Sequence, residues 1–235
     1  MKRSAASTFL IAWLLLLSWI STGFAAESPL PAGFVYLSDV APDIQLELRY
    51  TTSENFLGQP VRGYLAPRCI MTQAAAVALK QVQEELKPFG LGLKIFDAYR
   101  PQQAVDHFVE WAKDIDDTRM KSVYYPRVDK QHLFRDGYIA DKSGHSRGSA
   151  VDLTLISRGL PPEPEKELDM GSGFDYFGPE SWPDYPHISA AQRSHRMLLQ
   201  VLMKKHGFEP YDKEWWHFKL IDEPFPDTWF NFPVQ

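Results

Sequence analysis

The chain has 235 residues, of which 44% are hydrophobic and 14% aromatic, and its formal net charge is −5. This apolar content excludes intrinsic disorder, and the length allows one domain with a sizeable core. The acidic balance, without a basic patch, argues against nucleic acid or an anionic membrane as the main partner.

The N-terminus is typical of a secretory signal peptide. Lys2 and Arg3 precede an apolar run over Phe9–Ile20, and small residues follow at Ala25 and Ala26. The run is shorter than the roughly 20 residues that cross a bilayer, although an uncleaved membrane anchor is the alternative. We therefore expect a signal peptide at 1–25, a periplasmic or secreted protein, and no stable membrane insertion after cleavage.

The remaining residues, 26–235, are expected to form one catalytic domain with a net charge of −7 once Lys2 and Arg3 are removed. Cys69 is the one cysteine, so no internal disulfide can form. A lone cysteine is more often a small buried hydrophobic residue than a nucleophile, and this is the interpretation favoured for Cys69.

Two helices are predicted in the first half of the chain. Thr72 is expected to cap a helix that runs to about Leu86, where Pro88 and Gly90 follow. Pro101 suits the first turn of a second helix. Apolar residues fall there at helical spacing, at Ala104, Phe108, Trp111 and Ile115.

A third helix is predicted near the C-terminus. Ser189 and Gln192 form a capping box, and Gly207 provides a stop. Its expected apolar face consists of Met197, Leu198, Val201 and Leu202.

The strand candidates are Leu91–Phe96, Ala150–Ile156 and Trp215–Leu220, with a further one near Ile44–Tyr50. They do not alternate regularly with helices. This order favours an α+β fold with a mostly antiparallel central sheet flanked by helices. The residues from Arg158 to Pro186 are rich in Pro, Gly, Asp and Glu and predict a long loop.

The stretch SGHSRGSAVD, residues 143–152, places charged groups beside a predicted buried strand. Alternate residues of Ala150–Leu155 would face the core, so Asp152 would project from the other face. Gly148 permits a tight turn before the strand, which lets His145 fold back towards the same point. A plain hydrogen-bonded pair of His145 and Asp152 is the alternative interpretation.

A second stretch, EWWHFKL at residues 214–220, adds groups that a metal centre needs. Neutral imidazole and carboxylate are good zinc ligands, and a catalytic zinc takes three protein ligands and keeps one position open for water. His145, Asp152 and His217 would supply that set. Glu214 would be left free to take a proton from the bound water.

Glu214 and His217 are an odd number of positions apart, so a regular strand would point them to opposite faces. The metal hypothesis therefore predicts a bulge or a curved strand entrance at Glu214. Regular alternation through this strand would contradict it.

The stretch DAYRP, residues 97–101, closes a predicted strand and opens a predicted helix. A peptide carbonyl attacked by hydroxide develops negative charge, which a fixed guanidinium can stabilise. Arg100 is the candidate for that role, and Asp97 would orient it or bind substrate. A surface salt bridge at a helix start is the alternative.

These residues match a known family. The chain resembles the D-alanyl-D-alanine dipeptidases, zinc peptidases in the larger group that contains D,D-carboxypeptidases and the hedgehog signalling domain. The shared pattern S-x-H-x-x-G-x-A-x-D is met at residues 143–152 and is followed by E-W-W-H at residues 214–217. The resemblance covers nearly the whole mature chain through RYTTSENFLGQPVRGY, GLGLKIFDAYRPQQAVDHF, LDMGSGFDYF and DEPFPDTWFNFPV.

The resemblance implies a single domain of the hedgehog and D,D-peptidase type. It implies one zinc ion per subunit on His145, Asp152 and His217, with Glu214 as general base and then acid, and Arg100 stabilising the tetrahedral intermediate. It also implies a small enclosed pocket that admits a dipeptide and holds its two ends. The matching positions here are Tyr50, Tyr64, Asp97, Ser143 and Asp175.

The sequence therefore predicts an exported zinc dipeptidase that hydrolyses D-alanyl-D-alanine. A D,D-carboxypeptidase or peptidoglycan endopeptidase on the same scaffold would need an open groove, whereas the YTTSENFLG segment and the 158–186 loop look able to close the site. A non-catalytic binding module is the third hypothesis. Glu214 and Arg100 weigh against it, because a merely structural zinc requires neither.

Asp175 suits capture of a free ammonium, because an anion in a poorly solvated pocket pairs strongly with a cation. The signal peptide departs from relatives that protect cells from glycopeptides by acting on a cytoplasmic pool. It favours turnover of D-Ala-D-Ala outside the inner membrane over drug resistance.

Overall fold

The structure is a computed structural model that describes residues 30–159 and 164–235, so the expected signal peptide lies outside the described residues. The helices are α1 (Leu37–Val40), α2 (Gln73–Leu86), α3 (Gln102–Lys113), α4 (Lys121–Tyr124) and α5 (Ala190–Lys205). The strands are β1 (Phe34–Tyr36), β2 (Gln45–Leu46), β3 (Ile70–Thr72), β4 (Leu91–Asp97), β5 (Ala150–Ser157), β6 (Lys166–Glu167), β7 (Phe208–Tyr211) and β8 (Glu214–Leu220).

A six-stranded sheet, counted over the described residues, forms the centre of the fold. Its order is β2–β4–β5–β8–β7, with β6 beside β5. The β2–β4 pairing is parallel and the other pairings are antiparallel. The predicted α+β fold with a mostly antiparallel sheet flanked by helices is therefore confirmed.

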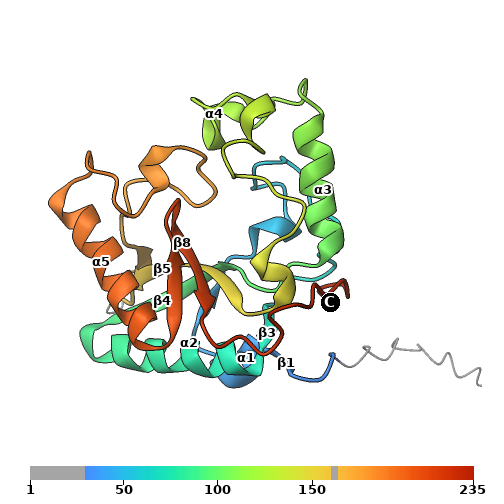
Figure 1. Cartoon of the computed structure of the whole chain (residues 1–235). Coiled ribbons are helices and arrows are strands. Elements are labelled where there is room, and N and C mark those ends of the chain that lie inside the picture. Colours follow the sequence, from blue (N-terminus) through green and yellow to red (C-terminus); the bar gives the residue numbers. More distant parts are fainter. Residues whose placement is uncertain (1–29, 160–163) are drawn as a thin grey trace, which may run out of the picture.

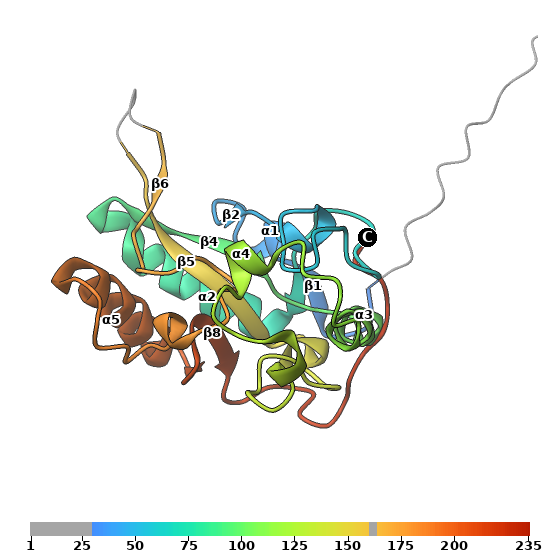
Figure 2. The same cartoon turned by 90° about the horizontal axis from the view of Figure 1, so that it is seen from above.

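The helices lie on two sides of this sheet (Figure 1). Helices α2 and α5 contact β4, β5 and β7, while α3 and the short α4 stand on the other side with their connecting loops. Seen from above, β4 and β5 run across α2, with α5 and α3 at opposite ends of the molecule (Figure 2). Strand β5 is buried along almost its whole length, because neighbouring segments cover both of its faces.

The predicted helix after Thr72 is confirmed. The Thr72 side chain accepts a hydrogen bond from the backbone N–H of Ala75, which satisfies one of the free donors of the first turn of α2. Helix α3 also begins as expected, directly after Pro101. It ends at Lys113, however, so the prediction that Ile115 continues the helical spacing is wrong, and Ile115 lies beyond the helix and is 59% exposed.

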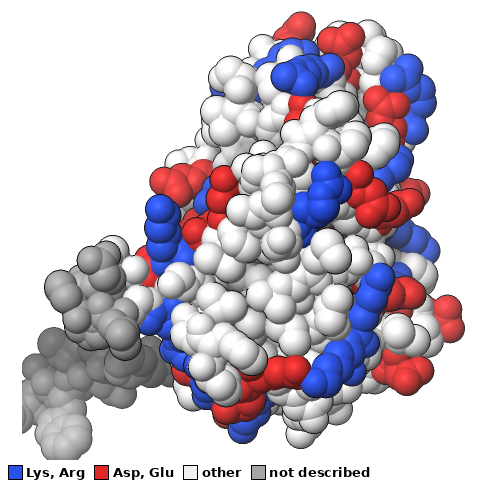
Figure 3. Space-filling model, turned by 90° about the vertical axis from the view of Figure 1, so that its left-hand side faces the viewer, with Lys and Arg blue, Asp and Glu red and all other residues white. Residues whose placement is uncertain are grey.

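The capping box of Ser189 and Gln192 is present at the start of α5, and Gly207 follows its end in the left-handed region. The predicted apolar face of α5 is wrong in three of its four positions. Leu202 is buried, whereas Met197, Leu198 and Val201 are exposed. The side of the molecule on which α5 lies shows a broad uncharged area with charged side chains around it (Figure 3).

Arg196 explains why α5 turns a different face inward. Its guanidinium is buried and donates hydrogen bonds to the carbonyl oxygens of Met170, Glu180 and Trp182. Three backbone acceptors satisfy this charged group, so it can occupy the protein interior. The inward face of α5 therefore carries Arg196 together with Leu199, Leu202 and Met203.

The strand predicted over Ile44–Tyr50 is reduced to β2, Gln45–Leu46. The chain then leaves the sheet through a 3₁₀ turn at Arg49–Thr51, which buries Tyr50. The backbone N–H of Val61 donates to the Tyr50 carbonyl and holds this turn against the following loop.

Cys69 is buried, as predicted. None of the helices in the described part of the chain is long and apolar enough to span a membrane.

Candidate active site

A cavity of about 320 Å³ lies between the sheet and the loops that face it. This volume is near the lower end of the roughly 300–1,000 Å³ typical of small-molecule sites. Both segments expected to close the site contribute to its wall, the first with Tyr50 and Phe56 and the second with Asp175 and Phe177. The cavity is therefore suited to a small ligand.

Strand pairing brings three of the predicted site residues into one row. Asp152 of β5 lies opposite His217 of β8, and opposite Asp97 of β4 on its other side. Residues directly opposite one another on antiparallel strands project to the same face. The sheet therefore places Asp152 between the other two.

His145 reaches this row from a 3₁₀ turn at Gly144–Arg147, just before β5. Gly148 ends the turn with a φ of +82°, a conformation that glycine adopts without strain. A Cβ atom at this position would lie 2.3 Å from the ring of Phe34. The tight turn predicted at Gly148 is therefore confirmed, for reasons of both conformation and space.

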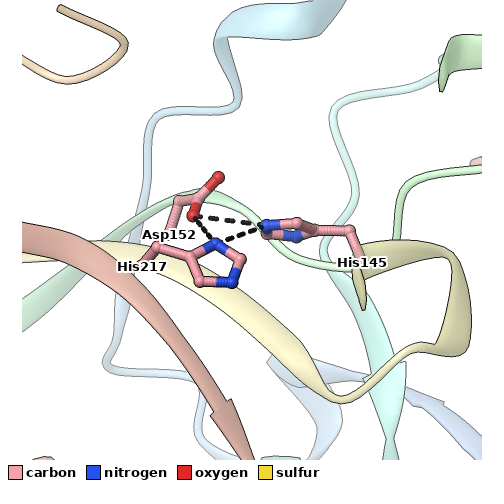
Figure 4. Close-up of side chains that lie close together, drawn as sticks. All are labelled: His145, Asp152 and His217. Carbon is pink, nitrogen blue, oxygen red and sulfur yellow. Dashed lines mark hydrogen bonds and ion pairs between the residues drawn. The ribbon is translucent and has the colours of Figure 1, made fainter. Parts of the chain in front are cut away.

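The side chains of His145, Asp152 and His217 converge on one point (Figure 4). Asp152 Oδ1 lies 3.0 Å from His217 Nδ1 and 3.3 Å from His145 Nε2, and the two nitrogens are 3.0 Å apart. Their potential ligand atoms all lie within 4.8 Å of one another, so this group could hold a metal ion.

Hydrogen bonding also suits His145 to bind a metal. Its Nδ1 lies 2.7 Å from the carbonyl oxygen of Ala98, an acceptor, so Nδ1 carries the proton. The lone pair of Nε2 is then directed towards Asp152 and His217. A backbone carbonyl that fixes the tautomer in this way is a common feature of histidine ligands.

The pKa shifts of His145 and Asp152 favour the forms that metal ligands need, whereas the shift of His217 favours its protonated ring. Burial lowers the pKa of His145, which favours neutral imidazole. Burial alone would raise the pKa of Asp152, but His145 and His217 outweigh it and lower that pKa. For His217, the hydrogen bond and charge of Asp152 outweigh burial and raise the pKa.

Glu214 reaches the same side as His217 because β8 is bulged. The β7–β8 register is regular at Pro210 opposite Phe218, then shifts so that Tyr211 faces Glu214. Glu214 Oε2 consequently lies 3.9 Å from His217 Nδ1. The predicted irregularity at the entrance of this strand is confirmed.

Burial raises the pKa of Glu214 to about 7, and the nearby Asp152 carboxylate adds to this shift. A carboxyl group with this pKa exchanges its proton near neutral pH. Such a group can act as both base and acid in one reaction.

Arg100 lies across the cavity and is held by two carboxylates. Its Nε donates to Asp97 Oδ2 at 2.8 Å and its Nη2 to Asp152 Oδ2 at 3.3 Å. The guanidinium also lies over the rings of Tyr50 and Phe108, each with its centroid 5.1 Å away. The orientation of Arg100 is therefore fixed before any ligand binds.

Asp175 stands in the cavity wall with a φ of 61° and a buried carboxyl group. Tyr50 donates its hydroxyl hydrogen to this carboxyl, 2.9 Å from Oδ2. Burial, together with the negative charge of Asp152, raises the pKa of Asp175 well above its ordinary value. A cation beside Asp175 would offset both effects.

The cavity wall includes eight of the ten predicted site residues: Tyr50, Arg100, Ser143, His145, Asp152, Asp175, Glu214 and His217. The other two, Tyr64 and Asp97, stand behind it as a pair, with Tyr64 donating to Asp97 at 2.6 Å. Asp97 thus contacts Arg100 from behind, which fits the expected orienting role rather than direct contact with a ligand.

Sequence reasoning missed part of the wall. Gly137, Tyr138, Ile139, Ala140, Lys142 and Tyr211 line the cavity without belonging to any recognised motif. Phe108 was expected only as a residue on a helix face. The DAYRP stretch could have predicted this role, because it places the start of α3 beside the site and Phe108 lies in that helix.

The fold and this site define a peptidase. Residues 31–235 match the sequence profile of a peptidase family described as D-ala-D-ala dipeptidase. The chain is 41% identical to a D-alanyl-D-alanine dipeptidase of Enterococcus faecalis and 40% identical to one of Streptomyces coelicolor. Each alignment covers 86% of this chain and 98% of the relative. The chain therefore belongs to the D-Ala-D-Ala dipeptidase family, as its motifs predicted.

A solved structure of a mutant of the vancomycin resistance D,D-pentapeptidase VanY in complex with Zn(II) shows a partial likeness. It aligns with 67% of this chain and 76% of its own chain, with a TM-score of 0.39 and 12% sequence identity.

Proposed function

We propose that this protein uses one zinc ion to hydrolyse D-alanyl-D-alanine to two D-alanines outside the inner membrane. The observation that carries the proposal is the arrangement of the cavity. A group of three potential metal ligands, a carboxyl with a pKa of about 7 and a fixed guanidinium share one small space with the buried carboxyl of Asp175.

His145, Asp152 and His217 would hold the zinc ion. Two imidazoles and one carboxylate match the ligand types of catalytic zinc sites, and the open cavity beside them leaves room for substrate and water. When bound, zinc would supply a Lewis acid that lowers the pKa of a water molecule and polarises the peptide carbonyl.

Glu214 would move the protons. As a carboxylate it takes a proton from the attacking water, and as a carboxylic acid it returns that proton to the leaving amine. Its raised pKa suits both steps, since neither form is strongly favoured near neutral pH.

Arg100 would stabilise the negative charge that develops on the carbonyl oxygen. Asp97 and Asp152 hold its guanidinium in place, so little reorganisation is needed as the charge appears. Asp152 uses Oδ2 for Arg100 and Oδ1 for the two histidines, which couples the guanidinium to the metal site.

Asp175 would bind the substrate ammonium, with Tyr50 fixing the carboxylate by its hydroxyl. Ser143 would contact the substrate from the other wall. Its Oγ already accepts from the backbone N–H of His145, so its own hydrogen remains free to donate. A site that requires a free ammonium would exclude the interior of long chains.

The N-terminal sequence supports the proposed export. Lys2 and Arg3, the apolar run Phe9–Ile20 and the alanines that follow precede residue 31, where the family match begins. Cell fractionation with N-terminal sequencing tests this step. Active protein in the cytoplasm with residues 1–25 intact would refute it.

The activity is tested with purified protein and a panel of D,D-, L,D- and L,L-dipeptides beside a pentapeptide stem, with and without chelator. We expect cleavage of D-Ala-D-Ala that stops on chelation and returns with zinc. Cleavage of the pentapeptide at a comparable rate would favour a D,D-carboxypeptidase, and binding without turnover would favour a non-catalytic module.

A further inference from the structure

The cavity has more carboxyl groups than fixed cations. Asp152, Asp175 and Glu214 line it, while Arg100 and Lys142 carry the permanent positive charges among the described lining residues. A free dipeptide brings one ammonium and one carboxylate. The proposed zinc ion and Arg100 would both face the scissile carbonyl, so the carboxylate at the other end of the dipeptide would need a further cation.

Arg100 is poorly placed to be that cation. It is paired with both Asp97 and Asp152, and its side chain is only 12% exposed. A second anion on the same guanidinium would have to compete with these two carboxylates. These two ion pairs hold Arg100 beside the proposed metal site.

Lys142, in contrast, is available to bind an anion. Over the described residues it makes no ion pair with a carboxylate, and it precedes Ser143 at the edge of the cavity. Its Nζ lies 4.0 Å from the centre of the Trp229 ring. A cation–π contact at an exposed site holds an ammonium in place and leaves its hydrogens free for another acceptor.

Trp229 belongs to the C-terminal motif DEPFPDTWFNFPV, which the proposed chemistry does not otherwise use. The motif is tied to the turn that carries His145. The backbone N–H of Phe230 donates to the carbonyl of Ser146, and the carbonyl of Phe230 accepts from the N–H of Gln102. The position of the indole relative to the site is therefore set by the backbone.

We propose that Lys142, supported by Trp229, binds the C-terminal carboxylate of the dipeptide. This inference rests on the proposed dipeptidase function and identifies the residue that recognises the C-terminal end of the substrate. Asp175 and Lys142 would then select together for a peptide with both ends free. A longer peptide would present an uncharged amide to Lys142, and a charge-assisted hydrogen bond would be lost.

The test compares D-Ala-D-Ala with its C-terminal amide, which keeps the ammonium and the scissile bond but lacks the carboxylate. The zinc-loaded enzyme and its Lys142→Met and Lys142→Arg variants are assayed for kcat and KM on both substrates. Lys204→Met is the matched control, because Lys204 is exposed on α5 outside the cavity.

We expect Lys142→Met to lower kcat/KM for D-Ala-D-Ala by roughly 10- to 100-fold, mainly through KM, and to leave the amide almost unchanged. Lys142→Arg should restore most of the loss, and Lys204→Met should change neither substrate. Trp229→Leu should shift KM for the acid in the same direction by a smaller factor, because it removes the support and not the charge.

Two results would overturn the inference alone while D-Ala-D-Ala cleavage by the wild-type enzyme stands: no effect of Lys142→Met, or an equal loss on acid and amide. A wild-type enzyme that cleaves no D-Ala-D-Ala would overturn the proposed function, and this inference with it.

Discussion

Two ion pairs of almost equal length stand in opposite surroundings. In the cavity, Arg100 Nε lies 2.8 Å from Asp97 Oδ2, with side chains 12% and 2% exposed. On the surface, Lys87 Nζ lies 2.9 Å from Asp43 Oδ2, with side chains 35% and 30% exposed. Each pair also has a further charged neighbour, Asp152 in the first case and Arg158 in the second.

The difference shows that pair distance alone does not set the pKa of a carboxyl group here, because burial and the surrounding charges act against each other. At the half-exposed Asp43, burial also raises the pKa, but the hydrogen bonds from Lys87 and Gln83 and the charge of Lys87 together outweigh it and lower the pKa to about 2. In the cavity, burial raises the pKa of Glu214 to about 7 and that of Asp175 well above its ordinary value. The pKa of Glu214 therefore lies near neutral pH, far above that of Asp43.

The largest effect is expected from removing one of the three potential metal ligands in the cavity. His217→Ala removes one of the three potential ligands, so we expect loss of stoichiometric zinc and of turnover down to background. Metal analysis of the purified protein and the D-Ala-D-Ala assay measure the two. His187→Ala, an exposed position, should change neither. Full zinc and activity in His217→Ala would contradict direct ligation.

Glu214→Gln should produce the next largest effect. The amide keeps the size of the side chain but cannot take a proton, so we expect kcat to fall by roughly 10²- to 10⁴-fold with zinc retained. Glu209→Gln is the matched control, because Glu209 is exposed and pairs with Lys219 on the neighbouring strand. Unchanged kcat in Glu214→Gln would remove Glu214 from the proton transfer.

Asp97→Asn addresses the buried pair itself. It leaves the Arg100 guanidinium buried with Asp152 as its remaining carboxylate, so the free energy of unfolding should fall by about 3 kcal/mol. Urea denaturation of the metal-free protein measures this loss. A change below that of the surface variant described next would show that burial does not separate the two pairs.

Asp43→Asn should have the smallest effect. Its partners are half-exposed and screened by water, so the loss at pH 7 should stay below about 1 kcal/mol. The native pKa of about 2 is below the ordinary value of 3.8 for an aspartate. The stabilisation is therefore complete above pH 3.8 and disappears as the pH falls through 2. Wild type and variant should converge in acid, and a gap that widens there would contradict this linkage.

Several elements could be predicted because their cause is local. The Thr72 cap, the capping box of Ser189 and Gln192 and the turn at Gly148 each depend on a few neighbouring residues. The bulge at Glu214 could be predicted because side chains alternate between the two faces of a strand. Glu214 and His217, an odd number of positions apart, can share a face only if the strand is irregular. Local hydrogen bonds and steric limits decide such features within one turn or one strand.

Other features depended on which segments meet in space. The sequence of α5 shows an apolar stripe, yet three of its members are exposed because the carbonyls of Met170, Glu180 and Trp182 bind Arg196 on another face. The Ile44–Tyr50 segment has strand-like composition but turns inward to bury Tyr50.

The sequence alone determined the types of chemical group in the site. These groups could be identified from three stretches: residues 97–101, 143–152 and 214–217. Only the tertiary structure decided their arrangement: Asp152 between Asp97 and His217 across three strands, and Lys142 above the distant Trp229. The physical reason is that sheet pairing and burial act between residues far apart in the chain. Burial in turn sets the pKa values on which the proposed proton transfer depends.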